Sequence, residues 1–123
     1  MDVRTLQEEL ARFAAVRDWE QFHSPKNLSA ALAVEAAELL EIFQWMTEEE
    51  SRNLPSDGSR AEKVRHELAD VQIFLLRLAD RLGVDLEDAV KEKMALNEVR
   101  YPVELSKGNT KKYTDLRDSK CMD

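Results

Sequence analysis

Two pairs of acidic residues have a spacing that suits the binding of a metal ion. Glu35 and Glu38 are three residues apart, and so are Glu67 and Asp70. On a helix, a separation of three residues places both side chains on one face. If two such faces pack together, four carboxylates meet, and their repulsion and lost hydration favour the binding of a cation. Mg²⁺ prefers oxygen ligands and commonly shares the phosphates of a substrate.

The neighbours of these acids favour a metal site over a solvated surface. The first pair lies within Leu32–Leu40 and the second within Glu67–Phe74, the most apolar parts of their segments. Acids on a solvated face usually have charged neighbours. Spacing alone leaves both interpretations open, because charged side chains are mostly exposed and acidic pairs are common on helices.

Two aromatic residues follow the acids at helical spacing. Trp45 comes seven residues after Glu38, and Phe74 comes seven residues after Glu67. Seven residues of helix span about 10 Å and return to the same face. Each ring would then lie about a nucleotide's length from an acid, where a base could stack on it. The competing interpretation places both rings in the protein core.

Further candidates for ligand contact lie before and after the acids. The segment between the first two predicted helices contains Trp19, Glu20, Gln21, Phe22 and His23. Gln and His side chains both donate and accept, which suits contact with the edge of a base. An ordinary connection anchored by a buried Trp is the alternative. Lys93, Asn97 and Arg100 share a face of the last predicted helix, where they either meet phosphate, base and sugar or face solvent.

The composition disfavours several other classes of protein. With 18 Lys and Arg against 25 Asp and Glu, the net charge is −7, which disfavours a nucleic-acid polymer as the ligand. The sequence has no Gly-rich phosphate loop and no apolar run of membrane length. Its first residues lack the apolar core of a signal peptide, and the single cysteine, Cys121, cannot form an intramolecular disulfide. We expect a soluble, cytoplasmic protein.

Helical periodicity and scarce glycine and proline predict an all-α fold, a four-helix bundle. The four expected helices cover residues 2–18, 25–46, 59–82 and 86–100. Residues 47–58 are predicted to be a polar connection. We expect residues 1–102 to form one helical domain and residues 103–123 an extended or partly ordered polar tail.

Residues at the ends of the predicted helices support these limits. Ser24 is a suitable N-cap for the second helix, with Pro25 in its first turn. Ser59 and Glu62 fit a capping box at the start of the third helix. Gly83 suits the left-handed position that ends a helix, and Asp85 is a suitable cap for the fourth.

Several blocks of the sequence, in order, resemble one family. They are Arg17–Leu28, Glu35–Leu39, Phe43–Trp45, Glu67–Val71, Lys93-Met94, Asn97, Tyr101-Pro102 and Lys112–Thr114. Over about Phe13 to Leu116, the chain resembles the dCTP pyrophosphatase group of the MazG-like all-α nucleoside triphosphate pyrophosphohydrolases. Three positions depart from the pattern. Val34 and Leu10 stand where relatives often carry Glu and His, and Phe74 stands where the dCTP enzymes carry Tyr.

The resemblance implies hydrolysis between the α and β phosphates, which gives a nucleoside monophosphate and pyrophosphate. It implies Mg²⁺ at Glu35, Glu38, Glu67 and Asp70. It also implies base and sugar contacts from residues 19–23, Trp45 and Asn97, and a homodimer or a tetramer built from dimers. We add Phe74 and Lys93 as candidate substrate contacts.

The catalytic role among the acids is a separate hypothesis. Glu38 is our candidate for orienting the attacking water, with Glu41, one turn further on, as the alternative. A non-catalytic helical module that binds nucleotides or a partner is the competing function. A di-iron carboxylate bundle would need Glu-x-x-His pairs, whereas His66 follows Glu62 by four residues.

Overall fold

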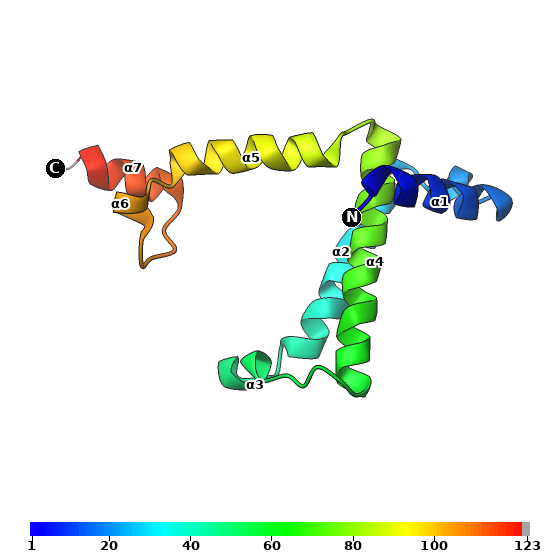
Figure 1. Ribbon diagram of the computed structural model, residues 1–123, viewed down its shortest axis with the longest axis horizontal. Helices are drawn as coiled ribbons and strands as arrows, with labels where there is room; N and C mark the ends of the chain where they lie inside the picture. Colours follow the sequence, from blue (N-terminus) through cyan, green and yellow to red (C-terminus); the bar gives the residue numbers. More distant parts are fainter. Residues whose placement is uncertain (122–123) are drawn as a thin grey trace. The chain divides into compact units, whose positions relative to one another are not determined.

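The computed structural model describes the backbone of residues 1–121 and the side chains of residues 1–117. All regular elements in this part of the chain are helical, which confirms the all-α fold class. The elements are α1 (Val3–Val16), the 3₁₀ turn η1 (Glu20–Phe22), α2 (Pro25–Phe43), α3 (Glu48–Arg52), α4 (Ser59–Leu82), α5 (Leu86–Arg100), α6 (Val103–Ser106) and α7 (Tyr113–Cys121) (Figure 1). The four long helices of the expected bundle are all present. The side chain of Cys121 lies outside the described residues.

The chain divides into two compact units, Met1–Val84 and Asp85–Asp123. The first unit contains α1 to α4 and the second contains α5 to α7. The assignment of residues 1–102 to one domain stays a prediction. None of the helices in the described part of the chain has the length and apolar character needed to cross a membrane.

Three of the predicted helix ends are confirmed by their hydrogen bonds and backbone angles. The Ser24 hydroxyl accepts from the Asn27 N–H at 3.2 Å, with Pro25 in the first helical position. A carboxylate oxygen of Asp85 accepts from the Asp88 N–H at 3.0 Å. Gly83 ends α4 in the left-handed conformation, with φ of 67°. Side-chain caps of this kind stabilise a helix by about 1 kcal/mol each.

The predicted capping box at Ser59 is wrong. The residue before the helix is Gly58, with φ of 96°, and Ser59 is already the first helical residue, so no side chain caps α4. A capping box occurs instead at Thr47, whose hydroxyl accepts from the Glu50 N–H while the Glu50 carboxylate accepts from the Thr47 N–H. This box begins α3 inside the segment predicted to be a connection.

In the first unit, α2 runs beside α4 in the opposite direction, and α1 packs on α4 (Figure 1). The buried apolar side chains of this unit are few and mostly small: Ala14, Leu28, Ala61, Leu76 and Ala79. The buried Gln7 on α1 donates its side-chain amide to the Leu76 carbonyl at 3.0 Å. This bond ties α1 to α4 because a buried amide without a partner would cost about 1–3 kcal/mol.

The second unit shows why residues 103–121 are more ordered than the sequence suggested. Leu116 on α7 is only 3% exposed. The Tyr113 ring meets the Tyr101 ring edge-on, with centroids 6.2 Å apart, and the Arg100 guanidinium lies 4.3 Å from the Tyr113 ring centroid. These contacts favour α6 and α7 over the extended or partly ordered tail that we predicted.

Candidate metal centre

Three of the four predicted acids meet between α2 and α4. One carboxylate oxygen from each of Glu35, Glu38 and Glu67 lies within 4.8 Å of the other two. Glu35 and Glu38 lie one turn apart on α2, and α4 supplies Glu67 from the facing helix. Asp70 follows Glu67 by about one turn and is not part of this closest group, although its charge acts on Glu35.

Glu35 carries the strongest electrostatic signature of the cluster. Its pKa is raised from 4.5 to about 7, first because the carboxyl is partly buried, then through hydrogen bonding with Glu38 and Glu67 and the negative charges of Glu38 and Asp70. Ionised carboxylates only accept hydrogen bonds, so two of these carboxyl groups can share a hydrogen bond only while one of them holds a proton. The cluster therefore favours a bound positive charge, either a proton or a cation.

Two oxygens in the cluster show that a metal ion fits it. Oε2 of Glu35 and Oε2 of Glu67 are buried and have no hydrogen-bond partner among the described side chains. Leaving a buried polar atom unpaired costs about 1–3 kcal/mol. A hard divalent cation removes this cost because it takes several carboxylate oxygens as ligands at once. The donor set therefore suits a divalent metal that prefers oxygen.

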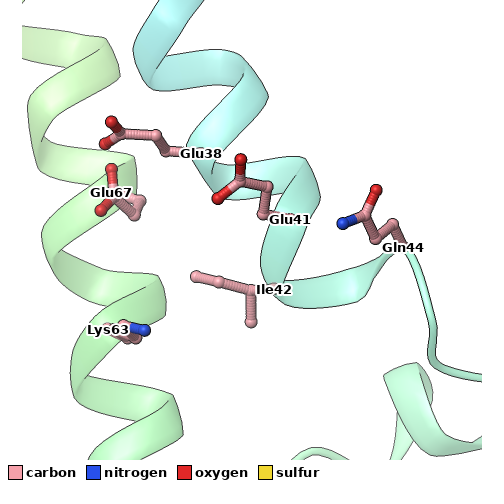
Figure 2. A pocket seen from close by; sticks show the side chains of 6 residues that line it. All are labelled: Glu38, Glu41, Ile42, Gln44, Lys63 and Glu67. Atoms are coloured by element: carbon pink, nitrogen blue, oxygen red, sulfur yellow. The ribbon is translucent and has the colours of Figure 1, made fainter.

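A cavity of about 520 Å³ lies beside the acids (Figure 2). Its lining residues are Glu38, Glu41, Ile42, Gln44, Lys63 and Glu67. In Figure 2 the carboxylates of Glu38 and Glu67 approach one another between the two helices, and Glu41 lies one turn further along α2. Glu41 thus lines the same space as the acids, as its candidate role requires.

Lys63 belongs to this site but was not among the residues predicted from the sequence. Lys63 lies one turn before Glu67 on α4 and lines the same cavity. A spacing of four residues puts two side chains on one helical face, so the signal was readable from the sequence. The cavity thus combines a positive side chain with the acids, an arrangement that suits a ligand whose phosphates bridge a metal ion and a lysine.

Residues 19–23 form a turn that local hydrogen bonds hold in shape. Asp18 has φ of 55°, and its carbonyl and carboxylate both accept from the Gln21 side-chain amide at 3.0 Å. The Asn27 side chain donates to the Phe22 carbonyl at 2.9 Å. The Trp19 ring is 44% exposed and Phe22 is more exposed still. Trp19 is therefore not a buried anchor, and both rings are accessible in this chain.

His23 connects this turn to α4. Its Nδ1 accepts a hydrogen bond of 3.2 Å from Nε of Arg77, which comes seven residues after Asp70. Seven helical residues span about 10 Å. The turn therefore meets α4 about two helical turns beyond the acids, with Phe74 half-buried on the helix between them. Glu20 is exposed within the same turn.

The structure corrects the prediction for Trp45. Helix α2 ends at Phe43, so Trp45 does not continue the helical face of Glu38. The helix was expected to reach residue 46 because Met46 extends the apolar periodicity, but the chain leaves the helix at Gln44. Trp45 is 89% exposed, which also excludes a core position in this chain.

Two further predicted contacts lie in the second unit. Lys93 and Asn97 both lie on α5, where Lys93 is exposed and Asn97 is half-buried. Their participation in a site with the acids stays a prediction. Arg100, on the same helix, stacks on Tyr113 within its own unit.

Known proteins are similar to this chain over most of its length. The chain matches the MazG-like family over residues 30–116, which include both acidic pairs. It is 49% identical over 115 residues to dCTP pyrophosphatase 1 of Mus musculus and 48% identical over 117 residues to that of Homo sapiens. In both cases, 94% of the chain is covered, but it spans only 66% of the relative's length.

A solved structure supports the same assignment. A pyrophosphatase from Archaeoglobus fulgidus is 40% identical in sequence, with a TM-score of 0.76. The match covers 83% of this chain and 94% of the archaeal one. The protein therefore belongs to the MazG-like family.

Proposed function

We propose that the protein hydrolyses nucleoside triphosphates to the monophosphate and pyrophosphate in the presence of Mg²⁺, with dCTP or related deoxynucleotides as substrates. The observation that carries this proposal is the meeting of Glu35, Glu38 and Glu67 between two helices, with two buried carboxylate oxygens left unpaired. The mammalian relatives are dCTP pyrophosphatases, which supports this substrate class.

The four predicted acids have one shared role in this proposal. Glu35, Glu38 and Glu67, with Asp70 one turn on, would hold Mg²⁺ through carboxylate oxygens. When bound, the ion neutralises charge on the triphosphate and polarises the phosphorus that is attacked. A local positive charge is needed because the chain as a whole has a net charge of −7, which by itself repels a polyanion.

Glu38 has a second role in this proposal, and two other residues of the cavity are assigned roles in the reaction. Glu38 orients the attacking water and accepts its proton, a role that a carboxylate within hydrogen-bonding reach of the water can perform. Glu41 lines the same cavity one turn away and is the alternative for this role. Lys63 stabilises the leaving pyrophosphate, because an ammonium group forms charge-assisted hydrogen bonds with phosphate oxygens.

We assign the nucleoside end of the substrate to the turn formed by residues 19–23. Trp19 offers an exposed ring for stacking, and Glu20, Gln21 and His23 offer polar atoms for a base edge, with Phe22 beside them. Phe74, on α4 between this turn and the acids, is a further candidate contact of the substrate. Trp45, Lys93 and Asn97 complete the substrate contacts.

We also propose that the active form is a homo-oligomer, a dimer or a dimer of dimers. Between α1 and α4 lies an apolar groove of about 700 Å³, whose lining residues include Leu6, Leu10, Phe13, Leu68 and Ile73. Phe13 and Leu68 are each about half exposed. Association of subunits would bury such surface and add to the small core. Light scattering of the purified protein tests this; a monomer at micromolar concentration contradicts it.

A panel of canonical and modified ribo- and deoxynucleoside triphosphates with Mg²⁺ tests the activity. We expect monophosphate and pyrophosphate in equal amounts, resolved by phosphorus NMR, with the highest kcat/KM for dCTP or a related deoxynucleotide. Monophosphate with two separately released phosphates would contradict cleavage between α and β. Tight nucleotide binding without turnover, with any divalent cation, would instead support the non-catalytic module.

A further inference from the structure

A buried arginine lies at the far end of α4 from Lys63. Arg77 is only 4% exposed, which is rare for a charged side chain. Its Nε donates to Nδ1 of His23 at 3.2 Å, and its Nη1 lies 3.8 Å from a carboxylate oxygen of Asp80. Its Nη2 is buried without a hydrogen-bond partner among the described side chains. The hydrogen bond to His23 is therefore one of the few interactions that offset the free-energy cost of burying this charge.

This contact fixes the protonation of the His23 ring. A guanidinium group only donates hydrogen bonds and stays protonated at all working pH values. Nδ1 of His23 must therefore carry a lone pair, and the proton of the neutral ring must lie on Nε2. A second proton at Nδ1 would break the bond and face the Arg77 charge.

The surroundings of His23 also favour the neutral ring. Burial and then the charges of Arg77 and Arg81 hold the pKa of His23 below its ordinary value of 6.5, while Glu20 opposes them. Asp80 pairs with Arg77 rather than with His23. The ring therefore stays neutral at neutral pH, as the geometry of the hydrogen bond also requires.

The other edge of the ring is free to contact a ligand. No residue among 1–117 forms a hydrogen bond with Nε2 of His23. The Trp19 ring lies nearby, with ring centroids 6.4 Å apart. The turn that carries both rings is fixed by its own hydrogen bonds. A stacking surface and an N–H donor at fixed positions suit a planar ring that has an acceptor on its edge.

We propose that Arg77 is a positioning residue that holds His23 as an Nε2–H donor for an acceptor atom on a nucleobase. The acceptor is a carbonyl oxygen or an unprotonated ring nitrogen, both of which cytosine carries. This role rests on the proposed function for its ligand, whereas the state of the His23 ring can be tested without any nucleotide.

The first test is the nitrogen NMR spectrum of the imidazole rings in the nucleotide-free protein. The chain has only two histidines, and His66 is exposed, so a His66→Gln variant assigns the signals and His66 serves as the internal reference. We expect His23 to be wholly Nε2-protonated, while His66 shows the mixture typical of a solvated ring. A mixed or Nδ1-protonated His23 would overturn the proposal.

Three variants separate the hydrogen bond from the charge. Arg77→Met removes both, and we expect mixed tautomers at His23 and a pKa that returns towards 6.5. Arg77→Gln keeps a neutral donor and should partly restore the Nε2–H form. Arg81→Met removes an exposed charge on the same helix and should leave the tautomer unchanged. If Arg77→Met disturbs the helical circular dichroism, Arg77→Leu replaces it as the variant without a donor. An unaltered tautomer in whichever of the two keeps the wild-type fold overturns the proposal.

Kinetics test the nucleobase contact. Loss of one neutral hydrogen bond costs about 0.5–1.5 kcal/mol, so we expect Arg77→Met to raise the KM for dCTP by roughly two- to tenfold with little change in kcat. His23→Ala should raise KM similarly, and the double variant should add nothing further. An unchanged KM, with the tautomer altered, would refute the nucleobase contact. If no triphosphate is hydrolysed, the proposed function fails, and the Kd of dCTP replaces KM in the same comparison.

Discussion

The two halves of α4 differ in how the charges of their buried side chains are paired. Near its middle, Glu67 meets Glu35 and Glu38, and buried carboxylate oxygens have no partner. Near its C-terminal end, Arg77 is buried more deeply and its Nη2 also has no hydrogen-bond partner in the described part of the chain, but Nε donates to the neutral His23 ring and the charge is paired with the Asp80 carboxylate. Unpaired like charges indicate where a ligand must supply the opposite charge, whereas a paired group serves to hold another residue in place.

Neutralising Glu67 should have the largest effect on the acid cluster. We expect Glu67→Gln to lower kcat/KM by roughly 10²–10⁴-fold, because the metal loses a charged ligand and the phosphates lose its charge compensation. In the absence of metal, the same variant should be at least as stable as the wild type, since one of three repelling carboxylates is gone. Turnover assays and urea unfolding in EDTA measure the two effects.

The matched control for this variant is Glu62→Gln on the same helix. Glu62 is exposed and should change neither quantity appreciably. Loss of stability in metal-free Glu67→Gln, with activity retained, would mean that the acids form a structural cluster instead of a metal centre.

Addition of Mg²⁺ should stabilise the wild type and leave Glu67→Gln nearly unaffected. A ligand that binds only the folded state adds about 2.7 kcal/mol to the free energy of unfolding at 100 times its Kd. Thermal unfolding with rising Mg²⁺ measures this shift, and EDTA should reverse it. The Arg77→Met variant should retain the full shift, because its site needs no cation. An equal response from Glu67→Gln would show that Mg²⁺ binds elsewhere.

The acid cluster was more predictable from the sequence than its surroundings. The three-residue spacing of Glu35 and Glu38 defines one face of any helix, and apolar neighbours indicated burial. Only the pairing of α2 with α4 remained to be shown. The predicted placement of Trp45 on the helical face of Glu38 was wrong because it depended on the last turn of α2, and helix ends are poorly determined by apolar periodicity.

The contact between Arg77 and His23 illustrates what the sequence could show only in part. Arg77 stands alone within the apolar run 73–78, and apolar neighbours indicate burial of this arginine as they do for the acids. Its partner could not be inferred, because His23 is 54 residues away and reaches α4 only through the geometry of the turn after α1. Similarly, α6 and α7 depend on contacts around Tyr113 and Leu116 that no local periodicity shows.

A variant of Lys63 tests whether the half of α4 that carries the acids also binds phosphate. We expect Lys63→Met to raise the KM for dCTP or lower kcat by about tenfold, since a charge-assisted hydrogen bond contributes about 1.5–3 kcal/mol and water replaces part of it. Lys91→Met is the matched control, because Lys91 is exposed and pairs with Glu87 on α5. Equal effects from both variants would indicate only a change in net charge.

The smallest expected effect is a difference in pH dependence between the two halves of α4. Glu35 has its pKa raised from 4.5 to about 7, so in that range the folded protein holds a proton that the unfolded chain lacks. The contribution of Glu35 to the free energy of unfolding therefore falls as pH rises through this window. His23 has a lowered pKa, so its contribution falls as pH drops below about 6.5.

Urea unfolding in EDTA, from about pH 5 to about pH 8, separates these opposite slopes. Glu35→Gln should leave a free energy of unfolding that rises with pH, because the His23 contribution then acts without opposition. His23→Gln should leave one that falls with pH. Mg²⁺ affinity should weaken as pH drops through about 7, because protons compete with the cation for Glu35. If both variants keep the wild-type pH dependence of the free energy of unfolding, the pKa of neither Glu35 nor His23 is shifted in the folded protein.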